Sequence, residues 1–171
     1  MRWGTLRLQI GGTAEMEVQL KLLDPRLAGW GFPHWGSDLA AGLDLHACLD
    51  APLAVAAQAP AILVPSGFAL SIGDGEWAAL VYPRSGLGHK RGLVLGNVVG
   101  VIDADYQGQV FLSAWNRNPP GSPDIVIEPG ERIAQMVFTR VTRPEFRLVE
   151  DFETASSRGA GGYGSTGTGP R

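Results

Sequence analysis

The chain has 171 residues, 17 acidic and 14 basic side chains, and a formal net charge of -3. This length suits a single domain large enough to bury a core. Because its charges are interspersed, the sequence lacks the basic stripe with which duplex-binding proteins neutralise phosphates, so we expect no nucleic-acid partner. An anionic ligand must then be met by local groups.

The composition also limits redox and membrane chemistry. The single cysteine, Cys48, excludes an intramolecular disulfide and is expected in the core, and the three histidines lack metal-ligand spacing. No apolar run approaches the roughly 18 residues of a membrane span, and residues 1–10 lack the apolar region of a signal peptide, so we expect no membrane partner and a cytoplasmic location. Frequent glycine and proline favour many short strands over long helices.

The N-terminal third is predicted to be largely strand and loop. Residues 1–20 are read as an N-terminal extension, poorly ordered in part. Polar and apolar residues alternate along residues 17–23 until the stretch becomes apolar, which predicts a first strand ending at Asp24. Residues 30–36 are read as a loop whose aromatic side chains pack on the body or on a neighbouring subunit.

The stretch 41–47, Ala-Gly-Leu-Asp-Leu-His-Ala, predicts a strand. Leu43 and Leu45 would face one side and Asp44 the other. Taken alone, this segment leaves Asp44 equally open to a surface or a functional role. His46 is read as a polar strand residue.

The next segments alternate between strand and turn signals. Residues 51–62 are alanine-rich, and a strand is favoured although a helix is conceivable. Residues 63–72 predict strand, turn and strand, and residues 77–82 predict a buried strand that leads into Pro83.

Residues 83–88, Pro-Arg-Ser-Gly-Leu-Gly, predict a strand end followed by a short helix beginning near Ser85. The free N–H groups of such a helix, its positive end, and the charged donors of Arg84 suit phosphate oxygens. The structural alternative is that Ser85 caps a helical turn and Arg84 is a surface charge.

Residues 97–110 contain two apolar runs separated by a turn, which predicts a hairpin with a buried first strand. Its turn would present Asp103 and Tyr106 beside an opening near Gly100. A carboxylate next to an aromatic ring suits a site that orients water and contacts a flat or sugar-like ligand. An Asx-type turn with a half-buried tyrosine is the alternative.

The C-terminal third predicts strands at residues 110–115, 125–127 and 132–138, with a loop at 116–123 to which no function is assigned. In the last strand Arg132 would be largely buried and would need a partner, which a purely structural carboxylate could provide. Residues 155–171 have glycine at about every other position and predict a flexible tail.

Five segments together resemble the five short motifs of the homotrimeric dUTPases, the dUTP pyrophosphatases. They occur in the family's order, at residues 41–47, 83–88, 97–110, 130–138 and 158–167. The resemblance implies an all-β subunit with a distorted jelly-roll or β-clip fold of many short strands. It also implies a homotrimer with active sites at the subunit interfaces. Residues 21–154 would be the catalytic core, and residues 155–171 an arm that closes over a neighbouring site.

The resemblance further implies hydrolysis of dUTP to dUMP and pyrophosphate by water that Asp103 activates for attack on the α-phosphorus. Ser85 would lie at the bond to be broken, Arg132 would support the catalytic carboxylate, and Gln135 would approach the phosphate chain. Mg²⁺ would be held mainly by the triphosphate, with Asp44 contributing through water.

The substrate-binding residues that the resemblance implies come from three of the motifs, together with Phe111, which directly follows the third. Arg158 would reach phosphate, and Tyr163, where the family usually has Phe, would stack on uracil. The full set is Arg84, Ser85, Gly86, Asn97, Gly100, Val101, Ile102, Asp103, Tyr106, Phe111, Arg158 and Tyr163.

Two other functions stay open at this point. One is a dCTP deaminase-like or bifunctional enzyme of the same fold, and the other is a catalytically silent trimer that binds nucleotide. The retained stretch 103–106 and the glycine-rich arm argue against both.

Overall fold

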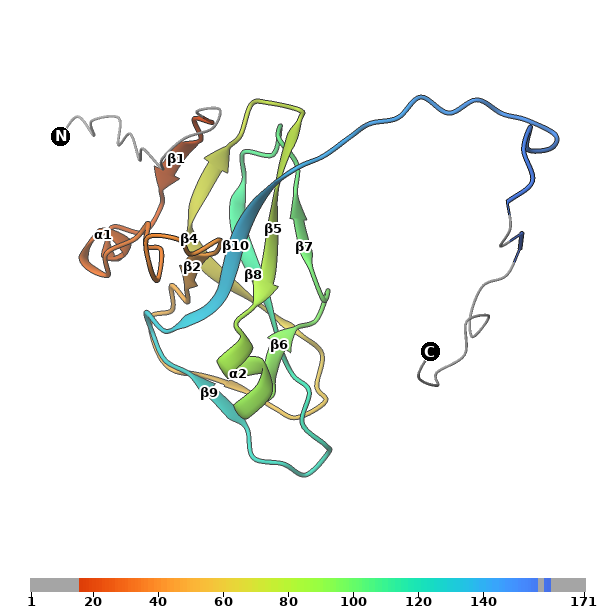
Figure 1. The fold of residues 1–171 in the computed structure, drawn as a ribbon. Coiled ribbons are helices and arrows are strands. Elements are labelled where there is room, and N and C mark those ends of the chain that lie inside the picture. The colour runs from red at the N-terminus through yellow and green to blue at the C-terminus, as the bar shows by residue number, and fades with distance from the viewer. Residues whose placement is uncertain (1–15, 157–158, 161–171) are drawn as a thin grey trace.

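The described residues form ten strands, in two four-stranded sheets and one two-stranded sheet (Figure 1). The computed structural model describes residues 16–156 and 159–160. In the first sheet the strand order is β1 (Gln19–Leu22), β4 (Ile62–Ser71), β8 (Gln109–Asn116) and β6 (Leu93–Leu95). In the second the order is β2 (Leu43–His46), β10 (Arg132–Arg140), β5 (Trp77–Pro83) and β7 (Gly100–Ile102). The expected all-β fold is confirmed.

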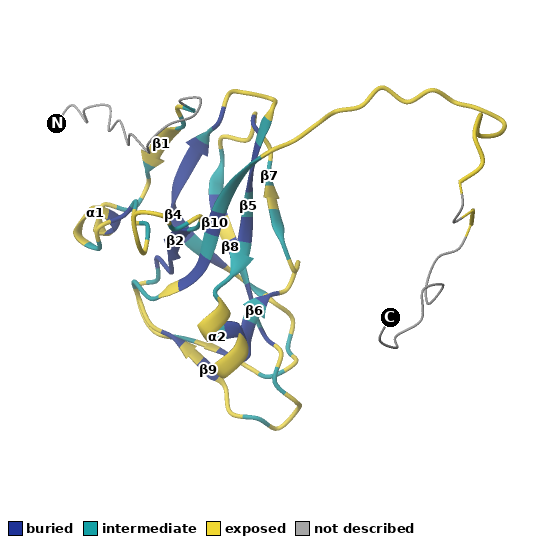
Figure 2. Ribbon diagram, viewed as in Figure 1, coloured by how far each residue is buried: buried dark blue, intermediate teal, exposed yellow. Residues whose placement is uncertain are grey.

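The remaining elements are small. Strands β3 (Leu53–Val55) and β9 (Ile125–Ile127) pair with each other, and the helices are α1 (Arg26–Gly29) and α2 (Ser85–Lys90). No helix in the described part of the chain is long and apolar enough to cross a membrane. Side chains from both large sheets, such as Phe68, Leu112, Leu45 and Met136, are fully buried in one core. Figure 2 shows this burial along the central strands.

The predicted hairpin at residues 97–110 is wrong, because its two arms belong to different sheets. β7 pairs with β5, whereas β8 pairs with β4 and β6. β7 is the edge strand of its sheet and is not buried as predicted: Gly100 and Ile102 are half-buried and Val101 is 62% exposed. The segment therefore crosses from one sheet to the other and turns a corner of the sandwich.

The turn predicted within residues 63–72 is also wrong, because β4 runs through without a break. Its register with β8 shifts between Pro65 and Ala69, and Gly67 has φ +78°. A glycine with positive φ lets a strand take up an extra residue as a bulge. A Cβ at Gly67 would lie 2.3 Å from Cys48 Sγ, so the bulge also lets β4 pass close to the buried cysteine.

Residues 51–62 form only the three-residue strand β3 before β4 begins, so the favoured strand is correct over a quarter of the stretch. The aromatic residues of the 30–36 loop pack on the body of the same chain. Trp30 stacks on His46 with ring centroids 5.7 Å apart, and Phe32 contacts Phe68 at 4.7 Å. His46 is buried and its Nδ1 lies 2.8 Å from the carbonyl oxygen of Gly130, so it is more than a polar strand residue.

The described residues cover only part of the predicted N-terminal extension and C-terminal arm. β1 begins at Gln19, just inside the predicted extension, and residues 1–15 lie outside the described residues. After β10 the chain leaves the body in an extended conformation (Figure 1), with Phe146, Leu148 and Phe152 exposed. Of the predicted arm, only residues 155–156 and 159–160 are described.

Candidate active site

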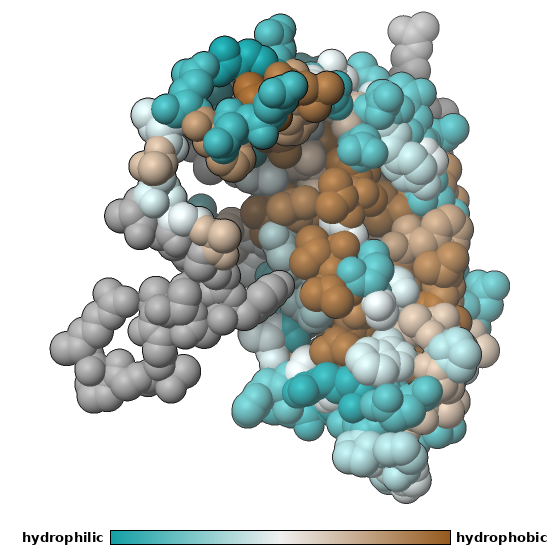
Figure 3. Space-filling model, turned by 90° about the vertical axis from the view of Figure 1, so that its right-hand side faces the viewer, coloured by the Kyte–Doolittle hydropathy of each residue, from teal (hydrophilic) through white to brown (hydrophobic). Residues whose placement is uncertain are grey.

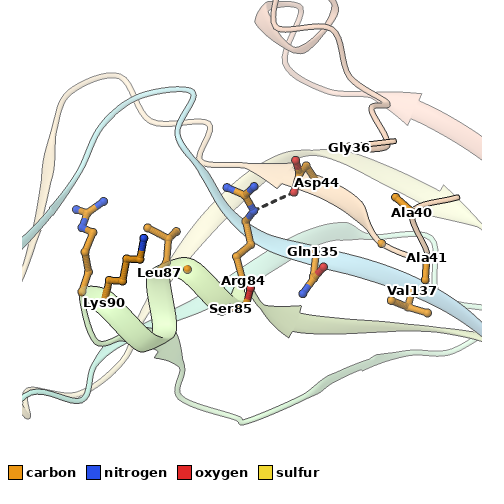
Figure 4. Close-up of a pocket in the computed structure, with 13 residues that line it drawn as sticks. Gly36, Ala40, Ala41, Asp44, Arg84, Ser85, Leu87, Lys90, Gln135 and Val137 are labelled. Carbon is orange, nitrogen blue, oxygen red and sulfur yellow. Dashed lines mark ion pairs between the residues drawn. The ribbon is translucent and has the colours of Figure 1, made fainter. Parts of the chain in front are cut away.

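A cavity of about 650 Å³ lies between α2, the loop before β2, and β10 (Figure 4). Residues from three of the five motif segments line it, although they are up to 96 positions apart in the sequence. The lining residues are Gly36, Ala40, Ala41, Gly42, Asp44, Arg84, Ser85, Gly86, Leu87, Lys90, Arg91, Gln135 and Val137. The fold thus brings Asp44, Arg84, Ser85, Gly86 and Gln135 together.

Asp44 is the centre of this cavity's charge network. Its Oδ1 lies 2.9 Å from Nε of Arg84, and its Oδ2 accepts a hydrogen bond of 2.8 Å from Nη1 of Arg132. The residue is only 7% exposed, so its carboxylate needs such partners. β2 carries Asp44 beside β10, and β5 delivers Arg84 from the other side of β10. Arg132 therefore pairs with Asp44 and not with the catalytic carboxylate of Asp103, and the prediction that it is largely buried is wrong, because its side chain is 43% exposed.

Gln135 joins the three motif segments. Its Nε2 donates a hydrogen bond of 3.0 Å to the carbonyl oxygen of Pro83. A Cβ at Gly42 would lie 2.6 Å from its Oε1, so the glycine leaves room for the amide. The strand register places Gln135 opposite both Asp44 and Tyr82. The Gln135 side chain is thereby fixed against the strand that leads into Ser85.

The start of α2 at Ser85 is confirmed, but the alternative in which Ser85 caps the helix is wrong. The N-cap residue is Arg84, whose backbone is extended, and no side chain caps the helix. Ser85 is the first residue of α2 and lines the cavity instead. Lys90 and Arg91 line it from the other end of α2 and are not among the predicted site residues. The basic run after the second motif segment was the available signal.

A second group of predicted residues lies at the β7 corner. Asp103 is exposed, and its carbonyl oxygen accepts a hydrogen bond from the backbone N–H of Tyr106, which closes the turn. The Tyr106 hydroxyl donates to the carbonyl oxygen of Gln109 at 2.8 Å, so the ring is held over Gly108. Phe111 on β8 is 47% exposed. The remaining predicted residues of this group are Asn97, Gly100, Val101 and Ile102.

The turn that carries Asp103 and Tyr106 lies at the opposite end of β5 from Ser85. Ile102 pairs with Ala79 in an antiparallel register, so the next residue, Asp103, lies near the Trp77 end of β5. Ser85 lies just beyond Pro83, at the other end of the strand. At 3.3 Å per residue, about seven residues of strand separate them by roughly 20 Å. Figure 1 shows α2 and the β7–β8 connection at opposite ends of the sheet. Within one chain, Asp103 therefore reaches neither Ser85 nor Arg132.

The described residues provide no metal site of their own. Residues 16–156 and 159–160 contain no group of three His, Cys, Asp or Glu side chains placed to share an ion. Both oxygens of Asp44 already face arginine nitrogens. This donor set does not fit a protein-held cation. Arg158 and Tyr163 lie outside the described residues.

Sequence comparison identifies relatives over nearly the whole chain. The model of the dUTPase family matches residues 29–167. The deoxyuridine 5'-triphosphate nucleotidohydrolase of Paraburkholderia xenovorans is 53% identical over 152 residues, which cover 89% of this chain and 99% of that protein. The enzyme of the same name from Enterobacter sp. is 51% identical and covers 88% and 97% of the two chains.

Solved structures agree with the sequence comparison. The dUTPase of Staphylococcus bacteriophage 80alpha, in a mutant form with dUpNHpp, superposes with a TM-score of 0.74 at 26% identity, covering 89% of this chain and 99% of that chain. A mutant dUTPase from phage phi11 of S. aureus, whose structure has a structural Mg(II) ion, has a TM-score of 0.68 at 24% identity, over 81% and 99%. The five motif segments, the fold and these similarities lead to one conclusion: the chain belongs to the dUTPase family.

Proposed function

We propose that this chain hydrolyses dUTP to dUMP and pyrophosphate. The observation that carries the proposal is the match to the dUTPase family over residues 29–167, which spans both the cavity beside α2 and the β7 corner. Such an enzyme keeps dUTP out of the deoxynucleotide pool and supplies a precursor of dTMP, and we propose that it acts in the cytoplasm.

We further propose that the active site is shared between copies of the chain in a homotrimer. The separation of Asp103 from Ser85 along β5 supports this, because both are needed at one α-phosphorus. Exposed apolar side chains also support it, since large apolar patches on a soluble protein are typical of interfaces. Val98, Val101, Phe111 and Leu63 are all at least 47% exposed. Figure 3 shows apolar surface gathered on the side of the molecule where β7 lies.

In the proposed site the cavity beside α2 holds the phosphate chain. Arg84 offers guanidinium N–H groups, Ser85 lies at the bond to be broken, and Gln135 approaches the phosphates from β10. A phosphate group can come close to the backbone of Gly86, because the space beside its Cα is open: a Cβ there would meet no atom within 4 Å. Lys90 adds positive charge at the far wall of the cavity, where the neighbouring Arg91 is paired with Glu131.

The β7 corner of a neighbouring copy would hold the base and sugar. Asn97 and the backbone at 100–102 offer uracil a donor and acceptor edge, and Tyr106 packs under the deoxyribose where a 2′-hydroxyl would otherwise fit. Asp103 takes a proton from water as the oxygen attacks the α-phosphorus. The bond from that phosphorus to the bridging oxygen then breaks, and pyrophosphate leaves. Arg158 and Tyr163 would complete the site from the arm.

Magnesium enters this proposal only as an ion bound to the substrate. Because the described residues lack a cation-binding set, we propose that Mg²⁺ arrives with the triphosphate, where it neutralises charge on the leaving pyrophosphate. The contact from Asp44 through water stays a prediction.

Release of pyrophosphate from a panel of dUTP, UTP, dCTP and dTTP tests the proposed reaction. We expect release from dUTP alone. Ammonia release from dCTP would instead support the deaminase-like alternative. Tight binding of dUTP without any product would support the silent binding protein.

A further inference from the structure

The feature that points beyond the proposed reaction is the nearly buried carboxylate of Asp44. It lies between the guanidinium groups of Arg84, which precedes α2, and Arg132 on β10, and its side chain is 10% exposed. A buried carboxylate that loses both partners would be strongly unfavourable, and the two guanidinium groups would repel each other without it. The three side chains of Asp44, Arg84 and Arg132 therefore form one electrostatic unit, which we call the Asp44 clamp.

The clamp engages two N–H groups of Arg84 and leaves the others free. Nε of Arg84 lies 2.9 Å from Asp44 Oδ1, and Nη1 donates at 3.1 Å to the backbone carbonyl of Arg132. An arginine has five N–H donors, so three remain for a ligand. Arg84 lines the cavity, whereas Arg132 does not. The bonds thus hold the guanidinium plane while its remaining donors stay available to the cavity.

We propose that Asp44 is a positioning residue that presents Arg84 to the phosphate chain, and that it does so without magnesium. This inference rests on the proposed function, because the anion is taken to be the triphosphate of a uracil nucleotide. It differs from a role for Asp44 as a contact to the metal through water. A preorganised arginine binds more tightly because less side-chain entropy is lost when the ligand arrives.

Three roles for Asp44 predict three different results when its charge is removed. If Asp44 positions Arg84, the Asp44→Asn variant loses affinity for phosphate whether or not magnesium is present. If Asp44 only contacts the metal, affinity falls only when magnesium is present. If Asp44 only repels the anion, its neutralisation raises the affinity.

The experiment is calorimetric titration of the full chain with dUpNHpp, in EDTA and in excess Mg²⁺. We expect Asp44→Asn to weaken binding about tenfold or more in EDTA, and by a similar factor in Mg²⁺, as loss of a charge-assisted hydrogen bond predicts. Asp38→Asn is the matched control, because Asp38 is an exposed carboxylate on the loop before β2 and does not line the cavity. That variant should bind within about twofold of the original chain.

A double-mutant cycle identifies the route of the effect. In an Arg84→Lys background, the further change Asp44→Asn should cost much less affinity than it does in the original chain, because the residue being positioned is already gone. Equal losses in both backgrounds would show that Asp44 acts without Arg84, and would overturn the proposal.

A measurement on the unaltered protein covers the case in which Asp44→Asn does not fold. The Nε–H proton of Arg84, assigned by its disappearance in Arg84→Lys, should exchange slowly with water in EDTA and stay protected when Mg²⁺ and dUpNHpp are added. Fast exchange of this proton in EDTA, or loss of its protection when Mg²⁺ and dUpNHpp are added, overturns the inference. If the original chain does not bind dUpNHpp at all, the proposed function fails instead.

Discussion

Arg117 donates from Nε and Nη2 to the carbonyl oxygen of Gly88, at 3.2 and 2.8 Å. Asn118 follows it and donates from Nδ2 to the carbonyl oxygen of Arg91 at 2.8 Å. These carbonyls belong to the last turn of α2, where backbone oxygens lack partners within the helix. The loop after β8, to which the sequence assigned no function, therefore anchors the helix that forms a wall of the phosphate cavity.

Replacing Arg117 by Met should lower the free energy of unfolding by about 1 kcal/mol, because two charge-assisted hydrogen bonds to one partly exposed carbonyl are lost. Urea unfolding at a fixed protein concentration measures this change. Lys21→Met removes an exposed positive charge on β1 and is the control, with an expected change within about 0.5 kcal/mol. An Arg117→Met midpoint equal to that of the control would mean that the bonds to Gly88 do not stabilise the chain.

The Asp103→Asn variant should lose about 10²-fold or more of its turnover while it still binds dUpNHpp, because an amide cannot accept a proton from water. Asp105→Asn is the matched control, since Asp105 is an exposed carboxylate on the same turn. That variant should keep turnover close to the original value. Steady-state pyrophosphate release measures both, and normal turnover by Asp103→Asn would remove Asp103 from the catalytic role.

Burial, together with the smaller effect of the nearby carboxylate of Asp24, raises the pKa of the Cys48 thiol to about 11. The thiolate is the reactive form, so an aromatic disulfide reagent at pH 8 should modify the folded chain at least about 100-fold more slowly than the unfolded chain. Rapid modification of one thiol per folded chain would contradict this expectation.

The same pKa shift predicts a pH dependence of stability. The unfolded thiol loses its proton near its ordinary pKa of 9.0, whereas the folded thiol keeps it until about pH 11. Between these values the folded state binds more protons, so the contribution of Cys48 is fully present below pH 9 and decreases as the pH rises toward 11. The difference in unfolding free energy between the original chain and Cys48→Ala should decrease over that range.

Mixing two inactive proteins tests whether sites are shared between copies. One protein ends before Arg158 and the other carries Asp103→Asn. Under conditions that exchange subunits, we expect partial recovery of dUTP hydrolysis, because a mixed assembly can combine an intact Asp103 with an intact arm from another copy. If subunits exchange, as shown by mass spectrometry, and no activity returns, each arm serves its own chain.

Local signals in the sequence were sufficient for several elements. The strand before Pro83, the helix starting at Ser85 and the strand at residues 125–127 lie where they were predicted, because alternation, proline and glycine act over a few residues. The turn into β10 needed a residue with positive φ, and Gly130 has φ +78°. The family resemblance depended on short motifs and did not need the fold.

The tertiary structure alone decided which segments meet. The apolar runs around Asp103 have the composition of a hairpin, yet one pairs with β5 and the other with β4, because strand pairing depends on partners far away in the sequence. Arg132 clearly needed a carboxylate, but only the register of β2 against β10 shows that this carboxylate is Asp44. The sequence by itself determined the residue types of the site, and long-range packing determined that one chain divides them between two ends of β5.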